Sequence, residues 1–555
     1  MRTEDARIVL LAIALLGIGF LILGVLVPPA DVFFSCDGGS KYILTRAFLQ
    51  HDPSWPYLPY PGRALDPEAR FFPIRDVFSV RFGSSYFSTF PIYFPILSAP
   101  GYALFGFRGL FLLPWAGAVI ALGLFARLGR LLGWSVRGRL AGVLLLGLAT
   151  PLGFYGCTFW EHVPALALVL GGIVTLLDGS GLEGSRGRRF AAGLLLGLTG
   201  FLRLEALWVG AAVLAVLAVP RDTRRRLLPL AGGFVLALLL LGVANLLTYG
   251  SPLGTHIFAN LVGTGQSRWR VLQHLVVGEG ASLGWAGLAL AVLAAGMMPG
   301  RPARLVRLVL CIGLLYPIAR MLLRETIPPG SYRSLMGALE GTPFLFLLPL
   351  AGRAAPRRVA HLGWVAALSF LAVIATSPVD GGLQGGSRLL LPSAVLALAA
   401  ALTRLAEAPR PARLDRWQRA ALVALLLVAV PLSSRSLPFL LYRKADVDRP
   451  ALEEIRRTPA DILMVTNANM PQGLAATYWE RPMVHVWDEA TIGSLLDRLA
   501  AAGGSRALMV SVPGVRSPAR LPVSPGEPAR WIRTSQGRIT LYQLDAYQRV
   551  PGEER

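Results

Sequence analysis

The stretch IVLLAIALLGIGFLILGVLV, residues 8–27, is an uninterrupted apolar run that decides the class of fold. In helical conformation a run of about 20 apolar residues crosses the hydrocarbon core of a bilayer. It has no small-residue cleavage site and further apolar runs follow it, which indicates a membrane anchor and not a cleaved signal. A polar loop comes next, and it carries the sequence CDGGSKY, residues 36–42.

The composition supports a membrane protein. Of the 555 residues 54% are hydrophobic and only 15% are charged, and the mean hydropathy is +0.55. A soluble chain of this length would need more polar surface. The net charge of +22 is carried almost entirely by arginine, because Lys41 and Lys444 are the only lysines. The arginines stand in short clusters between apolar runs, which is typical of cytoplasmic loops and not of a nucleic-acid surface.

These clusters predict a multi-pass protein of the plasma (inner) membrane with a cytoplasmic N-terminus. About 13 transmembrane helices follow from the apolar runs. The predicted spans are 8–28, 109–126, 140–156, 161–178, 190–202, 204–219, 227–249, 282–299, 305–323, 337–352, 359–377, 388–403 and 420–439. The predicted domains are a transmembrane domain, 1–439, and an extracytoplasmic α/β domain, 440–555.

Two apolar segments need special treatment. Residues 190–219 resemble one long helix, but arginine clusters flank both ends, so we predict two short helices that meet at an outward corner, Leu202-Arg203-Leu204-Glu205. Residues 91–106 contain three prolines, and we predict a helix in the outer membrane interface.

The two soluble parts of the chain have their own patterns. The first external loop, 29–108, contains a predicted hairpin within 71–90, centred on Gly83-Ser84-Ser85. In the C-terminal domain we predict strands and intervening helices. The strands are expected at 461–466, 482–487 and 506–512, and the helices near 470–479 and 489–503.

Asp37 is the first candidate catalytic residue, with Lys41 and Tyr42 as candidate substrate-binding residues. A carboxylate in an external loop close to the lipid headgroups could deprotonate an acceptor hydroxyl as general base. It could equally cap a helix that starts at CDGGSKYIL, with its carboxylate on the first backbone amides. The two roles are compatible.

A second group of candidates lies at the outer ends of later spans. Glu161, in FWEH, could orient a substrate or bind a metal, or it could be an acid in the first turn of a helix. Arg203 with Glu205 could hold a lipid phosphate, and a structural Arg–Glu pair is the alternative.

The glycine-rich segment GGLQGGSRLLLP, residues 381–392, is another candidate, because glycines let the backbone approach a ligand closely. Arg388 stands at the mouth of the following helix. His256 and Arg333, in outward loops, are weaker candidates for substrate binding. Cys36 and Cys157 both face outward, and we expect thiols because nothing except topology favours a disulfide.

Together these segments resemble the GT-C superfamily of integral-membrane glycosyltransferases, in particular the protein mannosyltransferase and aminoarabinose transferase group. The resemblance spans residues 1–440. It rests on the acid Asp37 and on the segments SSYFSTFPIYFPILSAPGYALFG (84–106), GFLRLEALW (200–208) and GGLQGGSRLLLP (381–392). Two features depart from the superfamily pattern: Gly38-Gly39 follow Asp37 where a second acid is common, and Leu204 stands where proline is usual.

The resemblance implies an inverting transfer of a hexosyl or pentosyl group from a polyprenyl-phosphate donor to a hydroxyl of a glycan, lipid or protein at the cell envelope. Asp37 would be the general base, and Arg388, Arg203 and a divalent metal would stabilise the leaving phosphate. No nucleotide is expected as a cofactor, and no nucleic acid as a partner.

Two other classes of function compete with this prediction. A transporter or flippase of lipid-linked glycans would place ionisable residues near the bilayer midplane, whereas the acids here fall near the outer ends of spans. A glycan polymerase or ligase would place its main external loop late in the chain, whereas here that loop directly follows the first span.

Overall fold

The computed structural model describes residues 3–75, 78–178, 183–255, 257, 267–277, 342, 357–378, 388–407, 430, 436–486, 489–514, 518–521 and 529–551. The chain forms two compact units. Unit 1 consists of Met1–Gly24, Leu113–Pro252 and Asn260–Pro438, and unit 2 of Val25–Leu112, Leu253–Ala259 and Phe439–Arg555.

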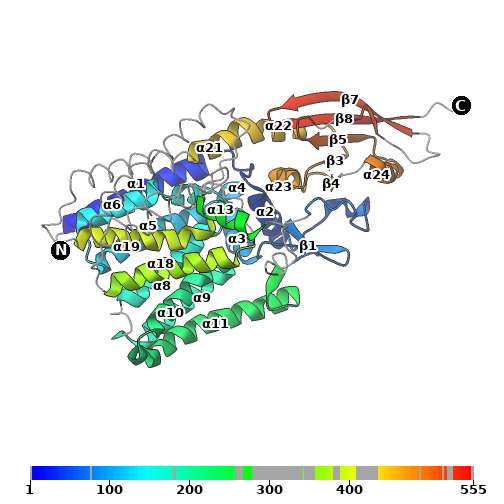
Figure 1. The fold of residues 1–555 in the computed structure, drawn as a ribbon. Coiled ribbons are helices and arrows are strands. Elements are labelled where there is room, and N and C mark those ends of the chain that lie inside the picture. The colour runs from blue at the N-terminus through cyan, green and yellow to red at the C-terminus, as the bar shows by residue number, and fades with distance from the viewer. Residues whose placement is uncertain are drawn as a thin grey trace. The chain divides into compact units, whose positions relative to one another are not determined.

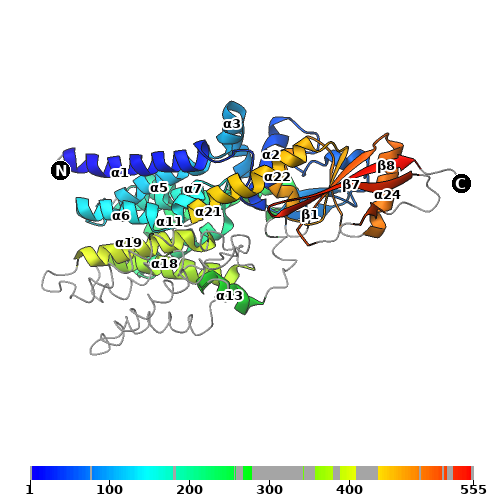
Figure 2. The same ribbon diagram turned by 90° about the horizontal axis from the view of Figure 1, so that it is seen from above.

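Unit 1 is helical in the part that the structure describes (Figure 1). Its helices are α1 (Thr3–Leu21), α5 (Leu112–Leu131), α6 (Val136–Leu148), α7 (Leu152–Gly156), α8 (His162–Asp178), α9 (Arg186–Leu198), α10 (Leu207–Ala218), α11 (Arg224–Tyr249), α13 (Arg268–Val277), α18 (Arg357–Thr376) and α19 (Leu391–Glu407). Helices α18 and α19 pack side by side, as Figures 1 and 2 both show.

Four helices among the described residues are long and apolar enough to cross a membrane: Ala6–Leu26, Phe107–Leu131, Arg224–Tyr249 and Val359–Thr376. They coincide with four predicted spans. The predicted span 140–156 is interrupted, because α6 ends at Leu148 and α7 begins at Leu152 after Pro151. Predicted spans 282–299 and 305–323 lie outside the described residues, as do nearly all of 337–352 and most of 420–439, so the total of about 13 stays a prediction.

The predicted corner within 190–219 is confirmed. Helix α9 ends at Leu198, two short 3₁₀ turns follow at Thr199–Phe201 and Leu204–Ala206, and α10 begins at Leu207. Helix α9 is held against α11 by reciprocal glycines. A Cβ on Gly193 would lie 1.9 Å from the Leu230 carbonyl oxygen, and one on Gly233 would lie 2.0 Å from that of Phe190.

Unit 2 combines helices with two sheets. Its helices are α2 (Cys36–Leu49), α3 (Tyr93–Phe105), α4 (Phe107–Leu110), α21 (Ser436–Tyr442), α22 (Arg449–Arg457), α23 (Met470–Gly473) and α24 (Glu489–Ala501). The predicted hairpin is confirmed as β1 (Ser79–Phe82) paired with β2 (Ser85–Ser88). The helix predicted over 91–106 is confirmed as α3.

The larger sheet has six strands in the order β4-β3-β5-β8-β7-β6. The strands are β3 (Ile462–Val465), β4 (Met483–His485), β5 (Arg506–Ser511), β6 (Arg520–Leu521), β7 (Ala529–Ile539) and β8 (Tyr542–Pro551). Strand β3 is parallel to β4 and β5, and the remaining pairs are antiparallel. Strands β3, β4 and β5 lie where the sequence predicts strands, but β6, β7 and β8 have no counterpart in the sequence prediction.

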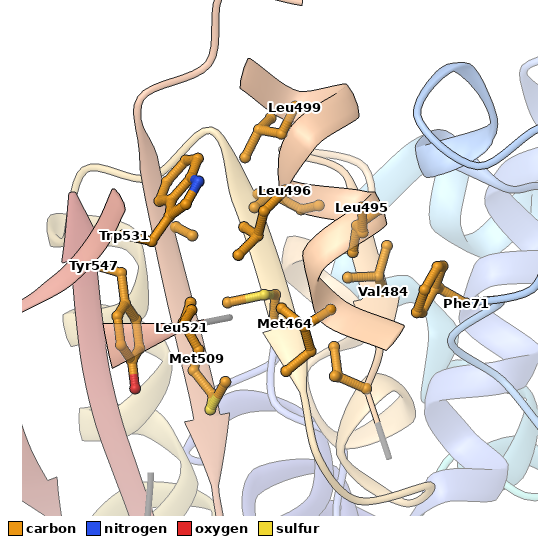
Figure 3. Close-up of a cluster of buried hydrophobic side chains, with 14 residues drawn as sticks. Phe71, Met464, Val484, Leu495, Leu496, Leu499, Met509, Leu521, Trp531 and Tyr547 are labelled. Carbon is orange, nitrogen blue, oxygen red and sulfur yellow. The ribbon is translucent and has the colours of Figure 1, made fainter. Parts of the chain in front are cut away.

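The core of unit 2 joins the first external loop to the C-terminal region. Helix α24 packs its apolar side chains on the sheet, where Met464, Met509 and Trp531 are buried, and Phe71 of the loop belongs to the same cluster (Figure 3). The amide of His485 donates to the Phe71 carbonyl over 2.9 Å. The loop and the C-terminal α/β region therefore fold as one unit.

Candidate functional site

The corner between α9 and α10 positions Arg203. The two 3₁₀ turns leave this residue extended, with φ −146° and ψ 117°, and its amide donates to the Thr199 carbonyl over 2.7 Å. An extended residue between two turns directs its side chain away from both helix axes. The backbone therefore presents the guanidinium to neighbouring segments of unit 1.

Arg203 pairs with two carboxylates. Its Nη1 lies 2.9 Å from Glu161 Oε1, and its Nε donates to Glu205 Oε1 over 2.6 Å. Nη2 also contacts Glu205. The side chains of Arg203 and Glu161 are only 8% and 1% exposed. The structural Arg–Glu pair that the sequence allowed is thus present and extends to a buried ion triad, in which one cation serves two acids.

Glu161 does not lie in the first turn of a helix, as the sequence allowed. Helix α8 begins at His162, and the Glu161 carbonyl accepts the first helical hydrogen bond from Ala165 over 3.0 Å. Glu161 is therefore the residue just before the helix. From this position its carboxylate reaches Arg203.

An aromatic cluster lies next to Glu161 in the sequence. The rings of Tyr155, Trp160 and His162 lie with centroids 5.4 to 5.7 Å apart. The Arg388 guanidinium carbon lies 4.8 Å from the Trp160 ring centroid, which is cation–π geometry. Both Arg203 and Arg388 are close enough to interact electrostatically with Tyr155. The fold thus brings Glu161, Arg203, Glu205 and Arg388 together.

Asp37 belongs to unit 2, on helix α2. The predicted helix is present, but the proposed cap is wrong: Ser35 is the N-cap, and its Oγ accepts from the Gly38 amide over 3.4 Å. Asp37 is an acid in the first turn, where the helix dipole favours a negative charge. Its side chain is buried, with 7% exposed. Ser35 thus caps the helix, Asp37 stabilises its first turn, and the catalytic role of this carboxylate stays a prediction.

The glycine two residues after Asp37 is explained by packing. A Cβ on Gly39 would lie 1.8 Å from the Gln472 carbonyl oxygen and 2.6 Å from its carbon. Helix α2 thus lies directly against the backbone of α23. A side chain at residue 39 would therefore collide with this backbone, which explains the glycine at that position.

We expect Gly39→Ala to destabilise the protein by about 1–3 kcal/mol, because the methyl group must displace the backbone of Gln472. Thermal unfolding of the full chain in a membrane mimetic measures the effect. Gly187→Ala is the matched control, since a Cβ there meets nothing within 4 Å, and it should be neutral or slightly stabilising. Equal melting temperatures for both variants would contradict the packing argument.

Lys41 and Tyr42 are interior residues of unit 2. The Lys41 Nζ lies 4.7 Å from the centroid of Phe90 and 5.7 Å from that of Phe94. Tyr42 is fully buried against aromatic rings, and its hydroxyl accepts from Arg46 Nη1 over 3.1 Å. Their predicted role in substrate binding stays a prediction, and the contacts show what each does for the fold.

Two further residues flank Asp37. Burial and, second, the charge of Asp37 raise the pKa of the Cys36 thiol to about 12, so this thiol stays protonated at neutral pH. Ser40 is fully buried, and its Oγ has no hydrogen-bond partner among the residues that the structure describes. Ser40 was not predicted, although its spacing of three residues places it on the same helix face as Asp37. Cys36 and Cys157 are both thiols, as expected.

A divalent metal has few ligands to use in the described part of the chain. Among those residues no three His, Cys, Asp or Glu side chains form a group able to hold a metal ion. The Glu161 carboxylate is already paired with the guanidinium of Arg203, and a metal would have to share or replace that buried ion pair. Glu161 as a metal ligand stays a prediction, and so does metal dependence.

Three predicted site elements lie outside the described residues. They are His256, Arg333 and residues 381–387 of the glycine-rich segment. Of that segment, the described part begins with the short 3₁₀ turn Arg388–Leu390, directly before α19.

The long apolar helices define the class of the molecule as a membrane protein. Helices α1 and α11 expose large apolar side chains, among them Leu10, Leu15, Leu239 and Leu247, which suit contact with lipid. No family model matches the chain, and no curated protein does.

Solved structures of three glycosyltransferases are similar to the chain. ArnT from Cupriavidus metallidurans, bound to undecaprenyl phosphate, has 16% identity and a TM-score of 0.45, with 98% of each chain covered. The oligosaccharyltransferase AglB from Archaeoglobus fulgidus, with an inhibitory peptide and a dolichol-phosphate, has 13% identity and a TM-score of 0.48, with 92% of this chain and 69% of that chain covered. The arabinofuranosyltransferase AftD from Mycobacteria has 14% identity and a TM-score of 0.40, with 98% and 41% covered.

All three are GT-C glycosyltransferases. The sequence resembles the same class of enzymes, and the likeness covers 92 to 98% of the chain. At 13 to 16% identity and TM-scores of 0.40 to 0.48, the likeness assigns neither a superfamily nor a residue role to this chain.

Proposed function

We propose that this chain is an inverting glycosyltransferase that moves a sugar from a polyprenyl-phosphate donor to a hydroxyl acceptor on the outer side of the membrane. One observation carries the proposal: the guanidinium of Arg388 lies over Trp160, the residue next to Glu161 of the buried triad. The triad joins one arginine to two glutamates and so has no positive charge to spare, and Arg388 is the group that would supply the positive charge for a phosphate.

Arg388 suits the phosphate better than Arg203 does. Three nitrogens of Arg203, Nε, Nη1 and Nη2, already contact Glu161 and Glu205. The N–H groups of a guanidinium lie in the plane of that group. The edge of this plane can therefore donate to two phosphate oxygens while the face lies over an aromatic ring. We therefore assign the leaving phosphate to Arg388 and a positioning role to the triad.

The chemistry needs a base and an anion site. In the proposed reaction Asp37 accepts the proton of the acceptor hydroxyl, and the oxygen attacks the anomeric carbon of the donor sugar. The bond from this carbon to the phosphate oxygen breaks, and the polyprenyl phosphate leaves with the electron pair. Arg388 stabilises the charge that develops on it. Attack from the face opposite the leaving group inverts the anomeric centre.

The experiment that tests the proposal measures binding of undecaprenyl phosphate and release of polyprenyl phosphate from a sugar donor. We expect Arg388→Ala to weaken lipid-phosphate binding about tenfold or more, because a charge-assisted hydrogen bond contributes about 1.5–3 kcal/mol. Arg404→Ala is the matched control, since Arg404 lies in the last turn of α19, the helix that directly follows the turn of Arg388, and this variant should bind as wild type does.

The outcomes separate the candidate functions. Unchanged affinity in Arg388→Ala would remove the phosphate site. A protein that moves the lipid-linked sugar across the membrane without releasing polyprenyl phosphate would be a flippase, and the transferase proposal would then fail. The nature of the sugar, hexose or pentose, would follow from which donor is consumed.

A further inference from the structure

One face of the six-stranded sheet changes from apolar to polar at one edge. Side chains alternate between faces along a strand, so Met464 and Thr466 share a face at the end of β3. Met509 and Ser511 share the same face at the end of β5, because Met464 pairs with Met509 in the parallel register. Met464 and Met509 belong to the apolar cluster beneath α24 (Figure 3). Thr466 and Ser511 continue that face beyond the cluster.

The hydroxyls of these two residues form no hydrogen bond with the described part of the chain. Among the described residues, neither Thr466 Oγ1 nor Ser511 Oγ has a partner, and Ser511 is fully buried. The strands hold the two residues next to each other, since the Thr466 amide donates to the Val510 carbonyl over 3.2 Å. An unpaired buried hydroxyl costs free energy, and in native proteins such a group usually has a function or a ligand.

Strand β8 adds a carboxylate and an amide to the same face. In the antiparallel register Gln543 pairs with Ser511, and Asp545 pairs with Met509. Asp545 is fully buried. Its Oδ2 accepts from Gln543 Nε2 over 2.8 Å, and its Oδ1 lies 3.7 Å from Arg533 Nη1. This polar cluster therefore contains two hydroxyls, an amide and a carboxylate. The cation next to it, Arg533, already pairs with the carboxylate of Asp545.

The position in the sheet is the one where open α/β sheets bind ligands. The chain runs from β3 to β4 on one side, and then returns to β5 on the other side of β3. The carboxyl ends of β3 and β5 thus flank the point where the strand order reverses, which is the usual ligand position of such sheets. Thr466 and Ser511 stand at these two carboxyl ends.

We propose that the carboxyl edge of β3 and β5 is a second ligand site, which binds a neutral carbohydrate through Thr466, Ser511 and Gln543. Hydroxyl and amide groups both donate and accept, and they match the vicinal hydroxyls of a sugar. A phosphate is disfavoured, because Asp545 would repel it and Arg533 is already engaged by that acid. Binding at this site requires neither the sugar donor nor Asp37. A negative result for this site would therefore leave the proposed transferase activity untouched, and the reverse also holds.

The test uses the full chain in nanodiscs of phosphatidylcholine, which avoids sugar-based detergents. Saturation-transfer difference NMR with glucose, mannose, galactose and arabinose detects bound sugar, and inorganic phosphate binding is measured in parallel. We expect the double variant Thr466→Val with Ser511→Ala to weaken sugar binding about tenfold. The same variant should raise the melting temperature of the sugar-free protein by about 2 °C, because two unsatisfied hydroxyls are removed.

The double variant is expected to bind sugar more weakly and yet to melt at a higher temperature, and this combination makes the test decisive. A purely structural role for the hydroxyls would lower the melting temperature, and that result would overturn the proposal. Equal sugar binding by the variant and the wild type would also overturn it. The same holds if the wild type shows no saturation transfer, or if it binds phosphate in place of sugar. Ser535→Ala, at an exposed position on β7, is the matched control and should change neither quantity.

Discussion

Replacing Asp37 with asparagine is expected to lower sugar transfer at least about 100-fold, the lower bound of what a positioned general base contributes. Asparagine has the same shape and can still accept a hydrogen bond, but it cannot take up the proton of an acceptor hydroxyl. The helix should persist, because Ser35 and not Asp37 is its N-cap. The measurement is release of polyprenyl phosphate from a sugar donor by the purified protein, with thermal unfolding recorded on the same sample.

Asp52→Asn is the matched control for this prediction. Asp52 follows α2 in the same loop, and its carboxylate accepts from the Ser54 amide and hydroxyl over 2.8 and 2.5 Å. An asparagine oxygen can accept both bonds, so transfer should remain close to that of the wild type. If Asp37→Asn transfers sugar at the full rate, Asp37 is not the general base, and another residue must take up the proton.

Removing the arginine of the buried triad is expected to have the largest effect on stability. Arg203→Ala leaves Glu161 and Glu205 facing each other with side chains only 1% and 14% exposed. Breaking a buried ion pair on one side costs about 3–5 kcal/mol, because a charge stays behind without its partner. We therefore expect a markedly lower melting temperature and poor recovery from the membrane.

A neutral variant separates charge from shape. When Arg203→Met is combined with Glu161→Gln and Glu205→Gln, no uncompensated charge remains, and most of the stability should return. Transfer activity of this triple variant then reports whether the triad acts only through positioning. A wild-type melting temperature in Arg203→Ala would show that the triad does not hold the corner between α9 and α10.

The sequence predicts the parts of this molecule that depend on local pattern. Charge clusters and hydropathy were enough to place the corner at Arg203, and turn residues were enough to place the hairpin around Gly83. Strands β7 and β8 escaped prediction, because their arginines, glutamines and serines do not alternate clearly between apolar and polar. A long antiparallel pair with one partly exposed face is stabilised by its partners more than by its own pattern.

The candidate site was predictable in its residue types but not in its pairings. That Arg203 takes two acids depends on a contact between residues 42 positions apart, and no local pattern encodes such a contact. The same holds for Ser35 as the cap of α2, since a serine and the following aspartate are both good caps and only backbone geometry chooses between them. The convergence of Asp37 with Glu161, Arg203 and Arg388 on one cavity stays a prediction.

The joint folding of the first loop and the C-terminal region has a consequence for biosynthesis. Gly39, two residues from Asp37, packs against Gln472, which the ribosome adds more than four hundred residues later. The segment bearing the proposed base therefore acquires this packing only after residue 472 has been translated. A chain that terminates between residues 440 and 472 keeps all the predicted spans and Arg388 but lacks the backbone on which α2 packs, so it should insert into the membrane and fail to transfer sugar.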